Sequence, residues 1–137
     1  MQKIEEIVSF FKENPVCALA TVNEEKPSVR PIQLMFEDEK KFYFCTANTK
    51  NMYKQMKTNP NVELTTSSKD YGTTLRICGK VKFNKNITLK QKIINTNSLV
   101  KSIYQTAENP IFEVFSIDHG TASLQYLNGD PTKTIVF

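Results

Sequence analysis

Two short segments hold the side chains best suited to chemistry. Residues 29–33 (VRPIQ) place the guanidinium of Arg30 in a predicted strand. Residues 45–51 (CTANTKN) place two hydroxyls, an ammonium and amides at the start of a predicted helix. Arginine gives an anion a planar two-pronged contact and lysine gives it a point charge, while free N–H groups at a helix N-terminus add positive partial charge. If strand pairing brings the two segments together, they form a phosphate site.

Each of these side chains also has a simpler interpretation. Arg30 can form an ion pair on a strand surface, Lys50 can be a solvated helix residue, and Thr46 and Thr49 can be helix caps. One at a time, the simpler interpretations prevail. At one strand–helix junction, the combination favours a phosphate ligand. Gln55, on the same predicted helix, is assigned a core or surface role.

The composition is typical of one folded domain, here residues 1–137. Of the 137 residues, 39% are hydrophobic and nine are Phe, which is enough for one core. The net charge is +4 and the sequence contains no block of basic residues, so charge is a weak argument for nucleic-acid binding. Cys17, Cys45 and Cys78 are far apart, which favours reduced thiols over a disulfide or zinc site. No segment resembles a signal peptide or a membrane span, so we expect a cytoplasmic protein that binds no membrane.

Hydrophobic spacing and turn residues give the following expected elements. Helices are predicted over residues 4–14, 49–57, 88–95 and 99–104, and strands over residues 16–22, 28–36, 41–46, 62–66, 73–83, 112–117, 121–127 and 134–137. The apolar strand 16–22 is predicted to be buried on both faces. Pro31 predicts an unpaired or bulged strand position, and residues 118–120 predict a turn. Short antiparallel hairpins with few crossover helices favour a closed barrel over a parallel sheet.

An ordered series of motifs resembles one known family. Residues 19–31 resemble its opening strand–turn–strand, residues 42–50 and 59–62 resemble its second segment, and residues 76–81 resemble its next strand. The likeness covers about residues 3–127. In this order and spacing, the chain is similar to the pyridoxamine 5′-phosphate oxidase-like, FMN-binding split-barrel family. The resemblance implies a mainly β fold with short helices, arranged as an antiparallel split barrel.

The same resemblance implies FMN as the cofactor and a homodimer with the flavin at the subunit interface. The backbone of the strand that holds Arg30 would border the flavin ring, and a second subunit would contribute a later strand. The residues implied to contact the cofactor are Arg30, Pro31, Ile32, Gln33, Cys45, Thr46, Thr49, Lys50, Asn51, Thr74 and Arg76. Thr74 and Arg76 would come from the second subunit, although Arg76 also suits a ladder position facing water.

The implied activity is that of a flavin oxidoreductase acting on an unidentified small molecule, with electrons from a reduced nicotinamide or another donor. Oxidation of pyridoxamine phosphate itself is disfavoured. Residues 128–137 lack the Arg and His of those enzymes, and Met35 stands where they carry a lysine. The alternatives are a flavin storage or electron-transfer protein, or a deazaflavin- or haem-binding variant in which His119 is the sole imidazole.

A third class of function is a small barrel that binds single-stranded nucleic acid through basic residues and stacked aromatics. Strand alternation would place Phe42 and Phe44 on one face and Tyr43 on the other. No stacking platform results, and we expect no nucleic-acid partner.

Overall fold

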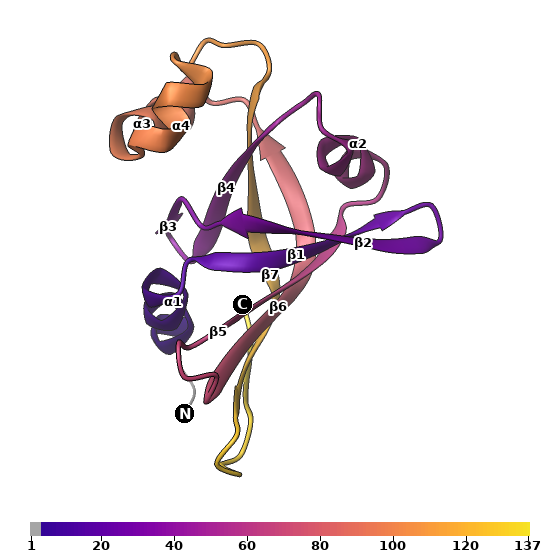
Figure 1. The fold of residues 1–137 in the computed structure, drawn as a ribbon, viewed down its shortest axis with the longest axis vertical. Helices are drawn as coiled ribbons and strands as arrows, with labels where there is room; N and C mark the ends of the chain where they lie inside the picture. Colours follow the sequence, from indigo (N-terminus) through magenta and orange to yellow (C-terminus); the bar gives the residue numbers. More distant parts are fainter. Residues whose placement is uncertain (1–3) are drawn as a thin grey trace.

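The computed structural model describes residues 4–137, which form twelve elements (Figure 1). In chain order they are α1 (Ile4–Glu13), β1 (Val16–Asn23), β2 (Lys26–Gln33), β3 (Phe36–Asp38), β4 (Lys41–Ala47), α2 (Asn51–Thr58), β5 (Asn61–Ser67), β6 (Thr73–Asn84), α3 (Ile87–Thr96), α4 (Ser98–Tyr104), β7 (Phe112–Tyr126) and β8 (Lys133–Val136). None of the helices in residues 4–137 is long and apolar enough to cross a membrane.

The strands form one antiparallel sheet in the order β2-β1-β5-β6-β7-β4-β3, and β8 pairs with β7. The two edge strands, β2 and β3, follow each other in the chain. Between them, Leu34 N donates to Pro15 O (2.8 Å) and Met35 N donates to Tyr43 O (2.9 Å). The chain therefore crosses from one edge to the other without pairing β2 with β3. The expected mainly β split barrel is confirmed, and the expected closure of the sheet is wrong.

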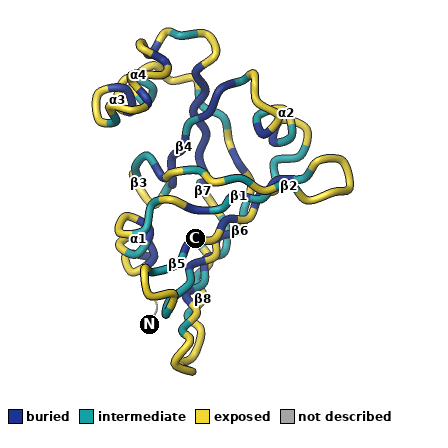
Figure 2. The backbone as a smooth tube through the Cα atoms, viewed as in Figure 1, coloured by how far each residue is buried: buried dark blue, intermediate teal, exposed yellow. Residues whose placement is uncertain are grey.

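The side chains of β4 alternate between two cores, and both faces of this strand are buried (Figure 2). Phe42 and Phe44 lie in the main core, where the ring centroid of Phe11 is 5.5 Å and 6.1 Å away. Tyr43 and Ala47 lie in a second core formed with α3 and α4. In Figure 1, α2 accordingly lies on one side of β4 and α3 and α4 on the other.

Strand β7 runs through the predicted turn at residues 118–120, so that prediction is wrong. Gly79 pairs with Gly120 and Val81 pairs with Ile117, which leaves two β7 residues opposite one β6 residue. This is a β-bulge, and it bends the strand without ending it.

The two glycines at the bulge are required by close backbone contact. A Cβ atom on Gly120 would lie 2.2 Å from Cys78 O, and one on Gly79 would lie 2.6 Å from His119 O. The turn-like composition of this segment therefore reflects the close approach of two paired strands at the bulge.

Strand β1 alternates between buried and partly exposed residues, which contradicts the prediction of burial on both faces. Cys17, Leu19 and Thr21 are buried, whereas Ala18 and Ala20 are half-buried. One face of β1 is thus only partly covered in the single chain.

Of the two alternatives predicted at Pro31, a bulge is absent from β2, and the outer side of the strand is unpaired. Pro31 lies opposite Ala18 in a continuous register. Because β2 is an edge strand, no strand on its other side needs the N–H that proline lacks.

Candidate functional site

Arg30 lies at the centre of a polar cluster that joins β1, β2 and α2. Its Nη1 donates to Thr21 Oγ1 (2.7 Å), and its Nη2 donates to Ser28 Oγ (2.9 Å) and Gln55 Oε1 (3.0 Å). Thr21 Oγ1 also donates to Gln55 Oε1 (2.6 Å). Partial burial lowers the pKa of Arg30.

All of these hydrogen-bond acceptors are neutral. Within residues 4–137 no carboxylate lies within ion-pair distance of the Arg30 guanidinium. The side chain is therefore held in place while its positive charge stays uncompensated, which suits the binding of an anion.

The N-terminus of α2 lacks a side-chain cap, unlike those of α3 and α4. The N-cap residue of α2 is Lys50, which makes no capping hydrogen bond, and the first turn contains no acidic residue. In α3, Asn86 accepts from Thr88 N (2.8 Å), and in α4, Asn97 accepts from Val100 N (3.0 Å). A cation at this helix end adds to the positive partial charge of the free N–H groups. The start of α2 is thus a second position suited to an anion.

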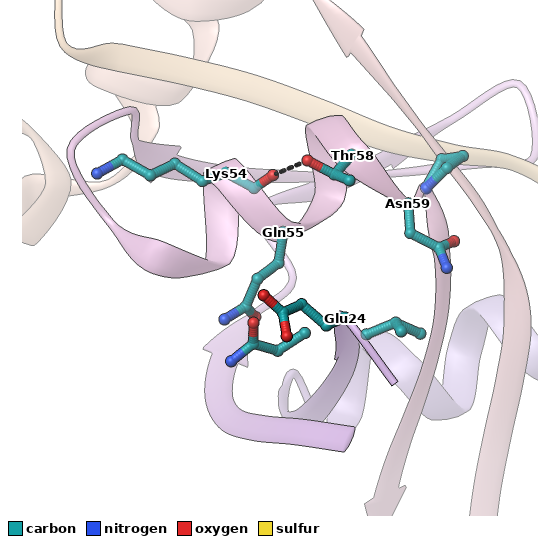
Figure 3. Close-up of a pocket in the computed structure, with 8 residues that line it drawn as sticks. Glu24, Lys54, Gln55, Thr58 and Asn59 are labelled. Atoms are coloured by element: carbon teal, nitrogen blue, oxygen red, sulfur yellow. Dashed lines mark hydrogen bonds between the residues drawn. The ribbon is translucent and has the colours of Figure 1, made fainter. Parts of the chain in front are cut away.

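Arg30 and Lys50 both adjoin α2, Arg30 through its hydrogen bond to Gln55 and Lys50 as the N-cap residue. Gln55, which holds Arg30, follows Lys50 by five residues, or about 7.5 Å along a helix axis. Five surface pockets of residues 4–137 are lined by neither Arg30 nor Lys50. Gln55 does line one of them, a pocket of about 500 Å³ that Glu24 also lines (Figure 3).

Thr46 carries a buried hydroxyl that has no hydrogen-bond partner within residues 4–137. The residue is 2% exposed and lies on the same face of β4 as Phe44. An unpaired buried hydroxyl costs about 1–3 kcal/mol, and Thr46 precedes the first residue of α2 by five positions in the chain.

Cys45 faces the opposite side of β4, in the core formed with α3 and α4. Burial raises the pKa of this thiol to about 12, although Lys50 acts in the opposite direction. The thiol is therefore protonated at neutral pH and a poor nucleophile. Cys45 and Thr46 cannot both reach one phosphate through their side chains.

The remaining predicted residues of this region divide between two faces. Ile32 shares the barrel-facing side of β2 with Arg30, whereas Pro31 and Gln33 are exposed on the other side. The outer edge of the β2 backbone pairs with no strand. Thr49, Lys50 and Asn51 are all exposed.

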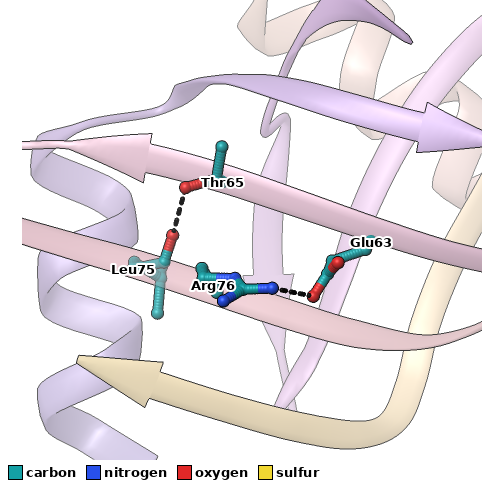
Figure 4. Close-up of polar contacts among 4 residues, drawn as sticks. All are labelled: Glu63, Thr65, Leu75 and Arg76. Atoms are coloured by element: carbon teal, nitrogen blue, oxygen red, sulfur yellow. Dashed lines mark hydrogen bonds and ion pairs between the residues drawn. The ribbon is translucent and has the colours of Figure 1, made fainter. Parts of the chain in front are cut away.

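Thr74 and Arg76 lie on the outer face of β6, on the other side of the sheet from Arg30. The Thr74 hydroxyl is 3.2 Å from Ser67 Oγ. Arg76 Nη2 donates to Glu63 Oε1 (2.8 Å) in an exposed ion pair (Figure 4). Within one chain, Arg76 thus has the water-facing ladder position that was its alternative interpretation.

Three members of the Arg30 cluster were not predicted as site residues from the sequence: Thr21, Ser28 and Gln55, the last of which was expected in a core or surface role. Thr21 and Ser28 are paired in the hairpin register, so the register itself was the available signal. The sole histidine, His119, is exposed at the β7 bulge, and residues 4–137 contain no group of three or more metal-ligating side chains.

Comparison with known proteins gives a family and a fold. The family model described as pyridoxamine 5′-phosphate oxidase matches residues 4–126. No curated protein matches the chain. A solved structure of a NimC/NimA family protein from Clostridium acetobutylicum is 30% identical, has a TM-score of 0.88, and is matched over 98% of this chain and 92% of that chain.

Two less similar structures share the fold. One is a pyridoxamine 5′-phosphate oxidase-related, FMN-binding protein from Nostoc punctiforme, with 14% identity, a TM-score of 0.74, and coverage of 98% of this chain and 89% of that chain. The other is a haem-binding protein from Mycobacterium smegmatis, with 11% identity, a TM-score of 0.75, and coverage of 99% of this chain and 58% of that chain. The family model spans nearly the whole chain, so this protein belongs to the pyridoxamine 5′-phosphate oxidase family, as its motifs indicated.

Proposed function

We propose that this protein is an FMN-binding flavoprotein that acts as an oxidoreductase on a small molecule. The observation that carries the proposal is the Arg30 guanidinium, which neutral oxygens hold beside a helix whose N-terminus is uncapped. The unpartnered hydroxyl of Thr46 lies just before that helix. A phosphate dianion needs positive charge and several donors, and this set of groups fits that need.

In this proposal the cofactor phosphate is bound by Arg30, Lys50, the hydroxyls of Thr46 and Thr49, and the first N–H groups of α2. The unpaired backbone edge of β2 at residues 31–33 borders the flavin ring. FMN, when bound, supplies one- and two-electron redox chemistry. The protein positions the ring and excludes water from one side of it. The protonated Cys45 takes no part.

The proposed assembly is a homodimer with the flavin at the subunit interface. The outer face of β1 presents the small side chains of Ala18 and Ala20 beside Val29, which is 67% exposed. These residues line a shallow hollow of about 250 Å³ that Arg76 also borders. Small side chains allow a second sheet to approach closely. A partner on this face would cover the exposed side of β1 and bring its own Thr74 and Arg76 into the interface.

A substrate or electron donor would reach the flavin from solvent. We expect the protein to act in the cytoplasm, with neither nucleic acid nor membrane as a partner.

The first test is the colour of the protein as purified: yellow with blue-light absorption supports a flavin, and red-brown supports haem. The cofactor-free protein is then titrated with FMN and binding is followed by fluorescence. Arg30→Ala and Lys50→Ala should each weaken FMN binding by about 1–3 kcal/mol, the cost of losing a charge-assisted contact. Lys85→Ala, at an exposed lysine before α3, is the matched control and should bind normally. Unchanged affinity in both site variants would exclude this phosphate site.

Turnover separates an enzyme from a flavin carrier. The reconstituted protein is assayed with a reduced nicotinamide and a panel of quinone and nitro acceptors, against free FMN at the same concentration. Activity no greater than that of free FMN would remove the enzymatic part of the proposal and leave storage or electron transfer.

A further inference from the structure

The loop between β4 and α2 is fastened to the start of β7 through one residue, Asn48. Its backbone N donates to Ile111 O (2.9 Å), and its side-chain Nδ2 donates to Pro110 O (2.8 Å) and Glu113 Oε2 (3.0 Å). Two residues later, Lys50 N donates to Ala47 O (3.1 Å). Three of these four hydrogen bonds reach a segment more than 60 residues away. The position of the loop is therefore set by a long-range contact.

Glu113 is an unusual residue to find at this position. It is 6% exposed, and within residues 4–137 no cation lies within ion-pair distance of its carboxylate. Asn48 Nδ2 is the donor that the structure gives it. A buried carboxylate destabilises the folded state unless it is hydrogen-bonded, so loss of this one donor would destabilise the contact between the loop and β7. Glu113 also pairs with Thr46, and the two side chains share one face of the sheet.

We propose that Asn48 and Glu113 are positioning residues for the phosphate-binding loop, residues 49–51. The inference rests on the proposed function, because the phosphate-binding role of residues 49–51 is part of that proposal. Asn48 and Glu113 do not themselves contact the cofactor. Asn48 directly precedes Thr49 and Lys50, and α2 begins at Asn51. A displaced Asn48 would move the hydroxyl, the ammonium and the first N–H groups of the helix together. Binding sites need their contacting groups fixed by such outer partners.

The pair allows a swap experiment. Asn48→Asp replaces the donor with an acceptor and places two carboxylates about 3 Å apart, a spacing at which like charges repel. We expect the FMN dissociation constant to rise at least about tenfold, the lower end of what outer-partner mutations cost at metal sites. Adding Glu113→Gln returns a donor to the pair, because the new amide can donate to the new carboxylate. The double variant should recover most of the affinity.

Hydrogen exchange gives a second readout that needs no cofactor. In the FMN-free protein, amide protection at Asn48 and Lys50 should fall in Asn48→Asp and return in the double variant. Thr66→Val is the control for stability alone. Thr66 Oγ1 is 3.0 Å from both Asn14 O and Val16 O, far along the chain from the loop. This variant should lower the melting temperature and leave the FMN affinity unchanged.

The inference is overturned if Asn48→Asp binds FMN as tightly as the wild type, or if its loss persists undiminished in the double variant. If the wild type binds no FMN at all, the proposed function fails instead. The exchange measurement then still decides whether the pair fixes the loop.

Discussion

Lys50→Asn should stabilise the cofactor-free protein and weaken FMN binding at the same time. The N-cap of α2 has an extended backbone conformation (φ −82°, ψ 150°), which an asparagine cap also uses. Asn86 already makes such a cap at α3, with its side chain 2.8 Å from Thr88 N. The same residue at position 50 can therefore accept from a first-turn N–H of α2.

Two terms give the expected gain in stability. A good N-cap contributes about 1 kcal/mol, and removal of a cation from the positive end of the helix dipole contributes about 0.5 kcal/mol. The free energy of unfolding should rise by about 1.5 kcal/mol, and the melting temperature by about 5 °C for a domain of this size. FMN binding should weaken roughly ten- to a hundredfold, since a charge-assisted contact of about 1.5–3 kcal/mol is lost.

Denaturant unfolding of the cofactor-free protein and FMN titration give the two quantities. Lys50→Met removes the charge without adding a cap and should give only the smaller part of the stabilisation. Asn86→Lys makes the reverse change at α3; it should cost about 1.5 kcal/mol and leave FMN binding unchanged. If Lys50→Asn stabilises the protein but binds FMN normally, the phosphate does not lie at the α2 N-terminus. If it gives no stabilisation, the first N–H groups of α2 do not lack a partner, and the uncapped helix end no longer supports an anion site.

Two further predictions concern the thiols and the β7 bulge. Burial raises the pKa of Cys17 and of Cys45 to about 12, so very little of either thiol is thiolate at pH 8. Both should therefore resist iodoacetamide until the protein is unfolded. The exposed Cys78 should react first. Mass spectrometry of labelled peptides checks this, and native-state labelling of Cys17 or Cys45 would contradict it. Gly120→Ala should cost about 2–3 kcal/mol of unfolding free energy, because its Cβ would lie 2.2 Å from a backbone oxygen. Gly129→Ala, where no atom lies within 4 Å but φ is +91°, should cost only about 1 kcal/mol in the same denaturation assay.

Local patterns predicted the helices and most strands because those elements follow from the spacing of apolar residues. Where a long-range contact decides the structure, the patterns failed. Residues 118–120 have turn composition, yet they continue β7 because Gly79 and Gly120 let the paired strands β6 and β7 approach closely at the bulge. Strand β1 reads as apolar on both faces, but the single chain buries one face and only partly covers the other. The second face is the one that the proposed homodimer would bury.

The candidate site likewise contains residues that could be recognised from local sequence and residues that could not. The chemistry of Arg30 could be recognised from residue type alone. Its partners Thr21 and Ser28 follow from the hairpin register, which the turn at residues 24–25 fixes. Gln55 could not be found in this way, because its contact depends on how α2 packs against β1. Glu113 and Asn48 lie 65 residues apart and were beyond any local pattern.

The proposed anion site lies where the folded chain, within residues 4–137, leaves two positive groups without an acidic partner. Proteins usually pair a partly buried guanidinium with a carboxylate and cap a helix with a side-chain acceptor. Here the Arg30 guanidinium has only neutral acceptors, and the α2 N-terminus has a lysine in place of a cap. Each departure is small. One of these charges is held against α2 through Gln55 and the other stands at its N-terminus, so we propose that a single anionic ligand compensates both, and the phosphorylated cofactor implied by the family resemblance is the candidate.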